Sequence, residues 1–194
     1  MRILLSLTML TMVAFASHHH DYHHASEVVE NSTAIVNNVS KGDPDISRSF
    51  KDIVTENGFR FEEHKITTQD GYILKVFRIP GKTATADAPL EGTNKKVVFM
   101  QHGILDSADC WIAHYASVAP AFVLARAGYD VWLGNSRGNK YSHDHTNAKI
   151  SKKAYWDFSF EKMGEKDLPA AIDYVLKNTG QAKLAYVGHS QGTS

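Results

Sequence analysis

The chain has 194 residues, and its 21 lysine and arginine residues balance its 21 aspartate and glutamate residues. This length suits one domain with a real hydrophobic core, and the balanced charge gives no indication of a nucleic-acid partner or an anionic surface. The single cysteine, Cys110, has no partner for an internal disulfide or a zinc site, so we expect it to pack as a small hydrophobic residue.

The first 16 residues have the features of a secretory signal peptide. Arg2 precedes an apolar stretch, and Ala14 and Ala16 have the spacing of a cleavage site. The apolar run is shorter than the ~18 to 20 residues that a membrane-spanning helix needs. We therefore expect cleavage after Ala16 and not a membrane anchor.

Residues 17–44 are predicted to form a polar arm. Their run SHHHDYHHA holds five histidines, a density that binds copper, nickel or zinc in some proteins, but we favour a disordered arm without a metal. Asn31 and Asn38 each begin an Asn-X-Ser/Thr sequon. Behind a signal peptide, these sequons predict N-glycosylation of a secreted protein.

Packed structure is predicted over residues 45–194. Two alternating stretches, residues 61–68 and 72–80, flank the turn Gln69-Asp70-Gly71 and predict an antiparallel hairpin. A polar stretch follows and predicts a connecting loop. The continuous apolar run KKVVFMQH at residues 95–102 then predicts a strand that is buried on both faces.

Helices and strands alternate after this run. We expect helices at residues 117–127 and from about residue 168 to Gly180, and buried strands at residues 129–134 and 183–190. Asp167 and Pro169 are start signals of the second helix, and Gly180 is its stop signal. The order predicts an α/β fold in which a mostly parallel sheet has helices on both faces and begins with the antiparallel hairpin.

The last predicted strand runs into GHSQG, which fits the pattern Gly-X-Ser-X-Gly. A serine hydroxyl is a poor nucleophile, and a sharp turn between a strand and a helix exposes it above the sheet. Gly188 and Gly192, two residues before and after Ser190, allow the strand and the helix to approach closely. Because the motif directly follows a buried strand, we expect Ser190 to be a catalytic nucleophile.

An acyl-transfer site also needs donors for the negative oxygen of the intermediate. In this arrangement one donor is the backbone N–H of the residue after the serine, which is Gln191. The second comes from the loop after the third strand, where His102 and Gly103 permit a tight turn that points the N–H of Ile104 at the site. We therefore predict an oxyanion hole at Ile104 and Gln191.

Other conspicuous side chains have structural interpretations. The stretch GNSRGN lies at the carboxyl end of a predicted strand, where a role at the rim of the site is one alternative. We favour a glycine-rich turn in which Arg137 bonds to backbone carbonyls. Trp156, Phe158 and Phe160 alternate, which favours packing at the entrance of a strand or helix over a role in a lipid channel. The other two tryptophans are expected in the core.

Five stretches of the sequence are highly specific in combination: TTQDGYILKVFRIP, VVFMQHGILDSADCW, AGYDVWLGNSRGN, WDFSFEKMGEKDLPAAIDYVLKNTGQ and YVGHSQGT. They span about Phe50 to Thr193 and resemble the N-terminal half of the gastric and lysosomal acid lipase family, within the α/β-hydrolases. The resemblance implies an α/β-hydrolase fold that the chain follows as far as the nucleophile turn. It also implies a secreted or lysosomal enzyme that hydrolyses neutral lipid esters, triacylglycerols or sterol esters, at a lipid–water interface, with Ser190 as nucleophile and the amides of Ile104 and Gln191 as oxyanion donors.

The acid and the base of that family's triad have no counterpart in the chain. In α/β-hydrolases the order is serine, then aspartate or glutamate, then histidine, so both partners are expected beyond Ser194. A neighbour on a sharp turn projects away from the serine, which excludes His189, and His143 and His145 lie in a stretch that we expect to be a solvated loop. We therefore expect residues 1–194 alone to be inactive, and we expect no metal and no cofactor.

A second hypothesis of another class stays open. The chain is then a secreted glycoprotein without catalytic activity that binds lipid or metal and ends at Ser194. An aspartate and a histidine encoded further downstream favour the enzyme, and a genuine stop codon favours the binding protein.

Overall fold

The computed structural model describes residues 47–82 and 95–194. The predicted signal peptide at residues 1–16, the arm at residues 17–44 with Asn31 and Asn38, and most of the connecting loop lie outside the described residues. From Arg48 onward the chain forms one compact unit.

The described strands form one mixed sheet in the order β1-β2-β4-β3-β6, and β5 pairs with β2 beside this path. β2 is antiparallel to β1, β4 and β5, whereas β3 is parallel to β4 and β6. All described strands except β2 therefore run in one direction, which confirms the predicted mostly parallel sheet with its antiparallel hairpin. The bounds are β1 (Glu62–Thr67), β2 (Tyr72–Ile79), β3 (Val97–Gln101), β4 (Asp130–Leu133), β5 (Asp144–His145) and β6 (Ala185–Gly188).

The hairpin between β1 and β2 turns at the predicted residues. Glu62 pairs with Arg78 at its open end and Thr67 with Ile73 near the turn. The Gly71 N–H donates to the Thr68 carbonyl at 3.0 Å, and Gly71 has a φ of 94°, which is accessible to glycine without strain.

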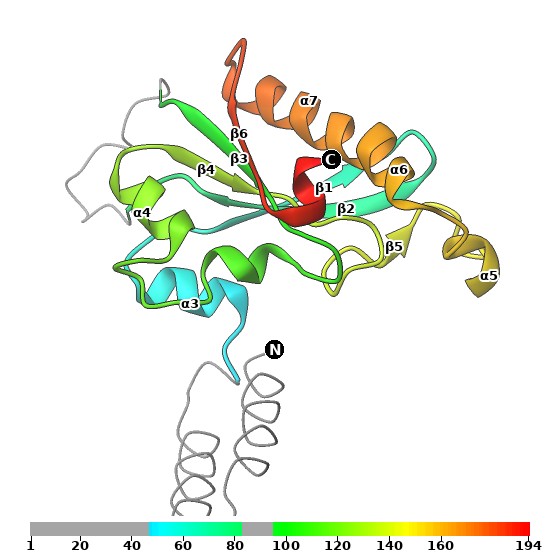
Figure 1. The fold of residues 1–194 in the computed structure, drawn as a ribbon, viewed down its shortest axis with the longest axis horizontal. Coiled ribbons are helices and arrows are strands. Elements are labelled where there is room, and N and C mark those ends of the chain that lie inside the picture. The colour runs from blue at the N-terminus through cyan, green and yellow to red at the C-terminus, as the bar shows by residue number, and fades with distance from the viewer. Residues whose placement is uncertain (1–46, 83–94) are drawn as a thin grey trace, which may run out of the picture. The chain divides into compact units, whose positions relative to one another are not determined.

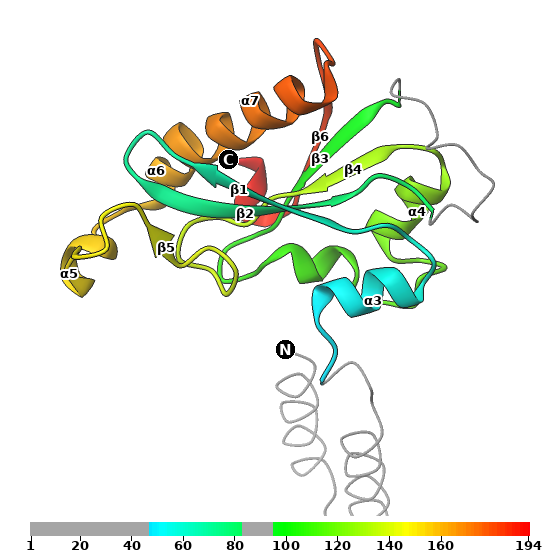
Figure 2. The same ribbon diagram turned by 180° about the vertical axis from the view of Figure 1, so that it is seen from behind.

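Helices cover both faces of the sheet, as the alternation of elements predicts. In Figures 1 and 2, α7 lies on one side of the sheet and α3 and α4 lie on the other. The helical segments are α3 (Phe50–Glu56), η2 (Ala108–Trp111), α4 (Pro120–Arg126), α5 (Lys152–Tyr155), α6 (Phe160–Lys162), the π-helical turn η3 (Met163–Asp167), α7 (Leu168–Thr179) and η4 (Ser190–Thr193).

Two clusters of buried side chains fill the space between the sheet and these helices. One joins α3 and α4 to the sheet through residues such as Phe50, Phe122 and Leu133. The other joins α7 to the opposite face, where Val175 packs with Phe99 and Trp132. Because side chains alternate between faces along a strand, β3 and β4 contribute to both clusters, as their continuous apolar sequences predict.

The prediction of a buried strand at residues 183–190 is wrong, because β6 pairs only with β3 among the described strands and its residues are exposed or partly buried. The predictions for the tryptophans and the cysteine are confirmed. Trp111 and Trp132 are both buried. Cys110 is half-buried and packs against the cluster that joins α3 and α4 to the sheet. Burial raises the pKa of its thiol to about 12. A thiol with this pKa stays protonated and behaves as a small hydrophobic group.

Two helix predictions need correction, and one further helix has no prediction. Helix α3 was not predicted, although Ser49 and Asp52 form a capping box at its start. Helix α4 begins at Pro120 and not at residue 117, because Pro120 fixes the first turn of the helix and Ala119 before it is extended. Before α7 the chain is already helical from Phe160, so Asp167 does not cap that helix. Gly180, with a φ of 67°, ends it as predicted.

Candidate active site

Strand β6 leads into the sharp turn that holds Ser190. Ser190 is exposed and has a φ of 53°, a left-handed conformation that is uncommon for a residue with a side chain. The turn is held by two backbone hydrogen bonds, from His189 N–H to the Gln101 carbonyl at 3.0 Å and from Gly192 N–H to the His189 carbonyl at 2.9 Å. Backbone strain of this kind is concentrated at functional sites, and a strained serine turn between a strand and a helix is the geometry of a nucleophile.

The two glycines of the motif permit this turn. A Cβ atom at Gly188 would collide with the carbonyl group of Gly192, and a Cβ atom at Gly192 would lie 2.5 Å from the carbonyl oxygen of Gln101. Contacts this close do not occur between real Cβ atoms and backbone. The close approach of the two backbone segments therefore requires glycine at both positions, as the Gly-X-Ser-X-Gly pattern predicts.

The turn after β3 lies against Ser190. A Cβ atom added to Gly103 would lie 3.0 Å from the Cβ atom of Ser190. Ile104 follows with its side chain 65% exposed, and Leu105 has a φ of 56°. The structure thus brings together the three predicted site residues, Ser190, Ile104 and Gln191, at the carboxyl ends of the neighbouring parallel strands β3 and β6.

A cleft of about 810 Å³ opens beside these two turns, and Ile104 and Gln191 both line it. Trp156, Phe158 and Phe160 line it as well. Trp156 is 49% exposed and Phe160 is 63% exposed. Trp156 also packs against the rings of Tyr155 and Phe158, and Phe160 begins α6, so the predicted packing at a helix entrance and a position along the cleft occur together. These aromatic side chains give the cleft an apolar wall.

None of the described histidines bonds to the Ser190 hydroxyl. His102 is buried and bonds to Gly103 and Ser136. His145 bonds to the Asp70 carbonyl at 3.1 Å on the short strand β5, and His143 is exposed. The His189 ring lies edge-on to Trp111, with 6.5 Å between the ring centres.

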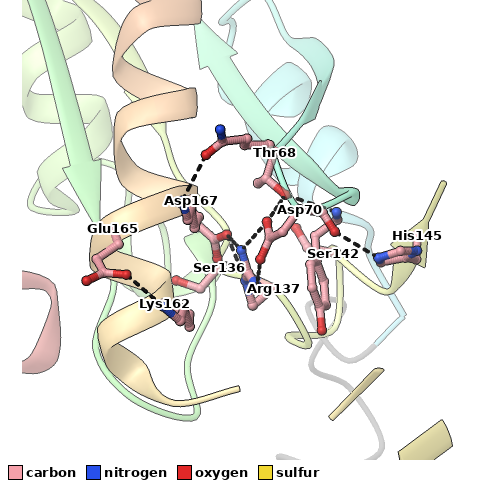
Figure 3. Close-up of polar contacts among 12 residues, drawn as sticks. Thr68, Asp70, Ser136, Arg137, Ser142, His145, Lys162, Glu165 and Asp167 are labelled. Carbon is pink, nitrogen blue, oxygen red and sulfur yellow. Dashed lines mark hydrogen bonds and ion pairs between the residues drawn. The ribbon is translucent and has the colours of Figure 1, made fainter. Parts of the chain in front are cut away.

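Arg137 lies at the centre of a buried ionic cluster, which corrects the prediction that it bonds to backbone carbonyls. Its side chain has no exposed surface. The guanidinium forms two hydrogen bonds to Asp70, at 2.7 and 3.0 Å, and its Nε donates to Asp167 at 2.8 Å. It also lies over the ring of Tyr72, 3.9 Å from the ring centre. Figure 3 shows Arg137 between the two carboxylates.

The two carboxylates respond differently to this shared cation. Partial burial raises the pKa of Asp70, but hydrogen bonds from Arg137 and Thr68 outweigh it and lower this pKa to about 2. For Asp167, burial raises the pKa and outweighs the opposing effect of Arg137. The difference follows from exposure, since the side chain of Asp70 is 34% exposed and that of Asp167 is 6% exposed.

The sequence interpretation missed both carboxylates as partners of Arg137. The local pattern predicts only a hairpin turn at Asp70 and only the start of a helix at Asp167. Asp167 reaches Arg137 from the π-helical turn η3. Turns of this kind are rare and often occur at functional sites, but no sequence pattern predicts them.

No group of three or more histidine, cysteine, aspartate or glutamate side chains is arranged to hold a metal ion in residues 47–82 and 95–194. Within the same ranges, no helix is long and apolar enough to cross a membrane.

Comparison with protein families matches residues 50–115 to the partial alpha/beta-hydrolase lipase region and residues 96–194 to the alpha/beta hydrolase fold. The chain is similar to the gastric triacylglycerol lipase of Bos taurus, with 46% identity over 78% of this chain and 37% of that protein. It is 46% identical to the gastric triacylglycerol lipase of Homo sapiens, over 79% of this chain and 38% of that protein. With the lysosomal acid lipase/cholesteryl ester hydrolase of Homo sapiens it shares 44% identity over 78% of this chain and 37% of that protein. The chain thus spans somewhat more than a third of the length of these relatives.

Replacing Arg137 with methionine is expected to destabilise the fold strongly. The variant leaves the buried carboxylate of Asp167 without its cation, which costs about 3–5 kcal/mol in comparable buried pairs. Urea unfolding of the full-length protein measures the loss. Lys162→Ala is the matched control, because Lys162 pairs with Glu165 on the surface at 2.9 Å and its loss should leave the unfolding midpoint nearly unchanged. Equal midpoints for wild type and Arg137→Met would contradict the assignment.

The Asp70 carboxylate is expected to make stability depend on acid pH. Its pKa is lowered from 3.8 to about 2 in the folded state, so its contribution is complete above 3.8 and is lost as the pH falls toward about 2. Wild type should therefore lose more unfolding free energy over this pH range than Asp70→Asn does. Urea unfolding at a series of pH values tests this, and parallel curves for the two proteins are the contrary result.

Proposed function

Because the chain belongs to the α/β-hydrolase fold family, we propose that the protein is a serine hydrolase that cleaves carboxylic esters of neutral lipids through an acyl-enzyme on Ser190. The observation that carries this proposal is the left-handed turn of Ser190 packed against Gly103. The turn presents the hydroxyl at the end of the sheet. The turn after β3 lies next to it, and the backbone N–H of Ile104 in that turn is the proposed oxyanion donor.

In the proposed mechanism, the Oγ atom of Ser190 attacks the ester carbonyl and the alcohol leaves after it is protonated. The backbone N–H groups of Ile104 and Gln191 stabilise the negative oxygen of the tetrahedral intermediate, and water later releases the acid from the acyl-enzyme. The proton of Ser190 needs a base. Since no described histidine bonds to Ser190, we assign the base and its acidic partner to residues that follow Ser190 in a longer protein, in the order that the fold uses.

Two observations support a lipid ester as substrate. The relatives are named triacylglycerol lipases and a cholesteryl ester hydrolase, so triacylglycerols or sterol esters are the proposed substrates. The cleft beside Ser190 has apolar side chains at its rim, namely Ile104, Leu105, Trp156 and Phe160, all of them exposed. An exposed apolar rim suits an enzyme that meets its substrate at a lipid–water interface.

We also propose that the protein enters the secretory pathway. The first 16 residues are proposed as a signal peptide, Asn31 and Asn38 as glycosylation sites, and the destination as the extracellular space or the lysosome. The sequence features that support this route lie outside the described residues.

Ester hydrolysis should depend on Ser190. In the full-length protein, Ser190→Ala is expected to lower the hydrolysis of an emulsified triacylglycerol by about 10⁴-fold or more, because the covalent step has lost its nucleophile. Ser194→Ala is the control, since Ser194 lines the same cleft and should retain activity. Residues 17–194 alone should show at most the residual catalysis of binding and oxyanion donors. Turnover by Ser190→Ala comparable to wild type would refute the proposal.

A further inference from the structure

His102 is a buried, hydrogen-bonded side chain to which the proposed mechanism gives no role. It lies between β3 and Gly103, and only 5% of its surface is exposed. Its Nδ1 atom lies 2.6 Å from the carbonyl oxygen of Gly103, and its Nε2 atom lies 3.1 Å from the backbone nitrogen of Ser136. Both ring nitrogens are therefore engaged by backbone groups.

These partners determine which ring nitrogen carries the proton. A carbonyl oxygen only accepts, so Nδ1 must donate to Gly103. The backbone N–H of Ser136 only donates, so Nε2 must accept, and the side-chain amide of Asn139 donates to the same nitrogen at 3.2 Å. Burial lowers the pKa of His102, which favours this neutral form of the ring.

The hydrogen bond from Nδ1 orients one peptide unit. The carbonyl of Gly103 and the N–H of Ile104 belong to the same trans peptide, in which the two groups point in opposite directions. Because the carbonyl is turned toward the His102 ring, the N–H of Ile104 is turned away from it. Gly103 adjoins Ser190, and Ile104 lines the cleft together with Gln191.

We propose that His102 is a positioning residue of the oxyanion hole, whose Nδ1 proton holds the Gly103 carbonyl so that the Ile104 N–H faces the cleft. The inference rests on the proposed function, because it assigns Ile104 as an oxyanion donor. His102 acts through the peptide that it orients and transfers no proton itself.

The opposite side of the ring is anchored to the buried ionic cluster. Ser136, which donates to Nε2, directly precedes Arg137, and the backbone N–H of Arg137 donates to Asp167 at 2.9 Å. Asn139 also donates to Asn135 at 2.9 Å, which braces the same loop. The loop after β4 therefore holds one edge of the ring in place while the other edge holds the Gly103 peptide.

Three substitutions separate the two edges of the ring. His102→Asn keeps an amide donor near the position of Nδ1 and loses the acceptor at Nε2. His102→Gln places its amide near Nε2 and loses the donor to Gly103, and His102→Leu removes both. Kinetics of each full-length variant with a soluble carboxylic ester give kcat and KM, and urea unfolding gives stability.

The proposal predicts that kcat follows the donor to Gly103. His102→Gln and His102→Leu should lower kcat by about 10²-fold, the size of the loss of one oxyanion donor, with little change in KM. His102→Asn should stay within about 10-fold of wild type, even though its stability falls. A kcat for His102→Gln equal to or above that of His102→Asn would overturn the proposal, because the ring would then serve only to anchor the loop.

A measurement on the wild-type protein covers the case in which variants fail to fold. Nitrogen-15 NMR of the labelled histidine rings distinguishes a protonated from an unprotonated ring nitrogen. The expected spectrum for His102 has its proton on Nδ1 and none on Nε2, and a proton on Nε2 would overturn the proposal. Absence of ester hydrolysis by wild type would instead refute the proposed function, so the two failures are distinguishable.

Discussion

The guanidinium of Arg137 is completely buried, and the fold around the cleft depends on its charge being neutralised. A buried cation is very unfavourable unless it is paired and hydrogen-bonded. Asp70 comes from the hairpin turn between β1 and β2, Arg137 from the loop after β4, and Asp167 from the turn before α7. Three segments that are distant in the sequence are therefore held at one point (Figure 3), and Arg137 and Asp167 line the cleft.

A chain of hydrogen bonds connects this ionic cluster to the turn after β3, which lies against the turn of Ser190. Arg137 fixes the loop that contains Ser136, Ser136 bonds to His102, and His102 bonds to Gly103. On the other side, the pairing of Gln101 with Gly188 places the ends of β3 and β6 at the same level. Sites in α/β sheets gather at such carboxyl ends. Gly103 and Gly192 allow the backbone after β3 and the backbone of the Ser190 turn to approach closely, so that both turns border the same cleft.

How much of this arrangement the sequence predicts depends on the range of the interactions. Local signals sufficed for the hairpin at Gly71, for the buried strands β3 and β4, for the end of α7 at Gly180 and for the close approach of the glycines around Ser190. Each of these follows from a few neighbouring residues. The partners of Arg137 could not be predicted, because Asp70 and Asp167 lie 67 and 30 residues away from it and each has an adequate local explanation. The exposure of Trp156 and Phe160 also depends on what covers them in three dimensions, which an alternating pattern does not reveal.

The turns of Ser190 and Ile104 are proposed to form one site for a tetrahedral intermediate, and a covalent complex tests this claim most directly. The measurement is a crystal structure of the full-length protein after reaction with an alkylphosphonate ester, whose phosphorus mimics the tetrahedral carbon. The expected result is a bond from phosphorus to the Oγ atom of Ser190, with one phosphoryl oxygen about 2.7–3.1 Å from the backbone nitrogens of Ile104 and Gln191. A phosphonate bound to another residue, or one bound to Ser190 with its oxygen directed away from both nitrogens, would contradict the claim.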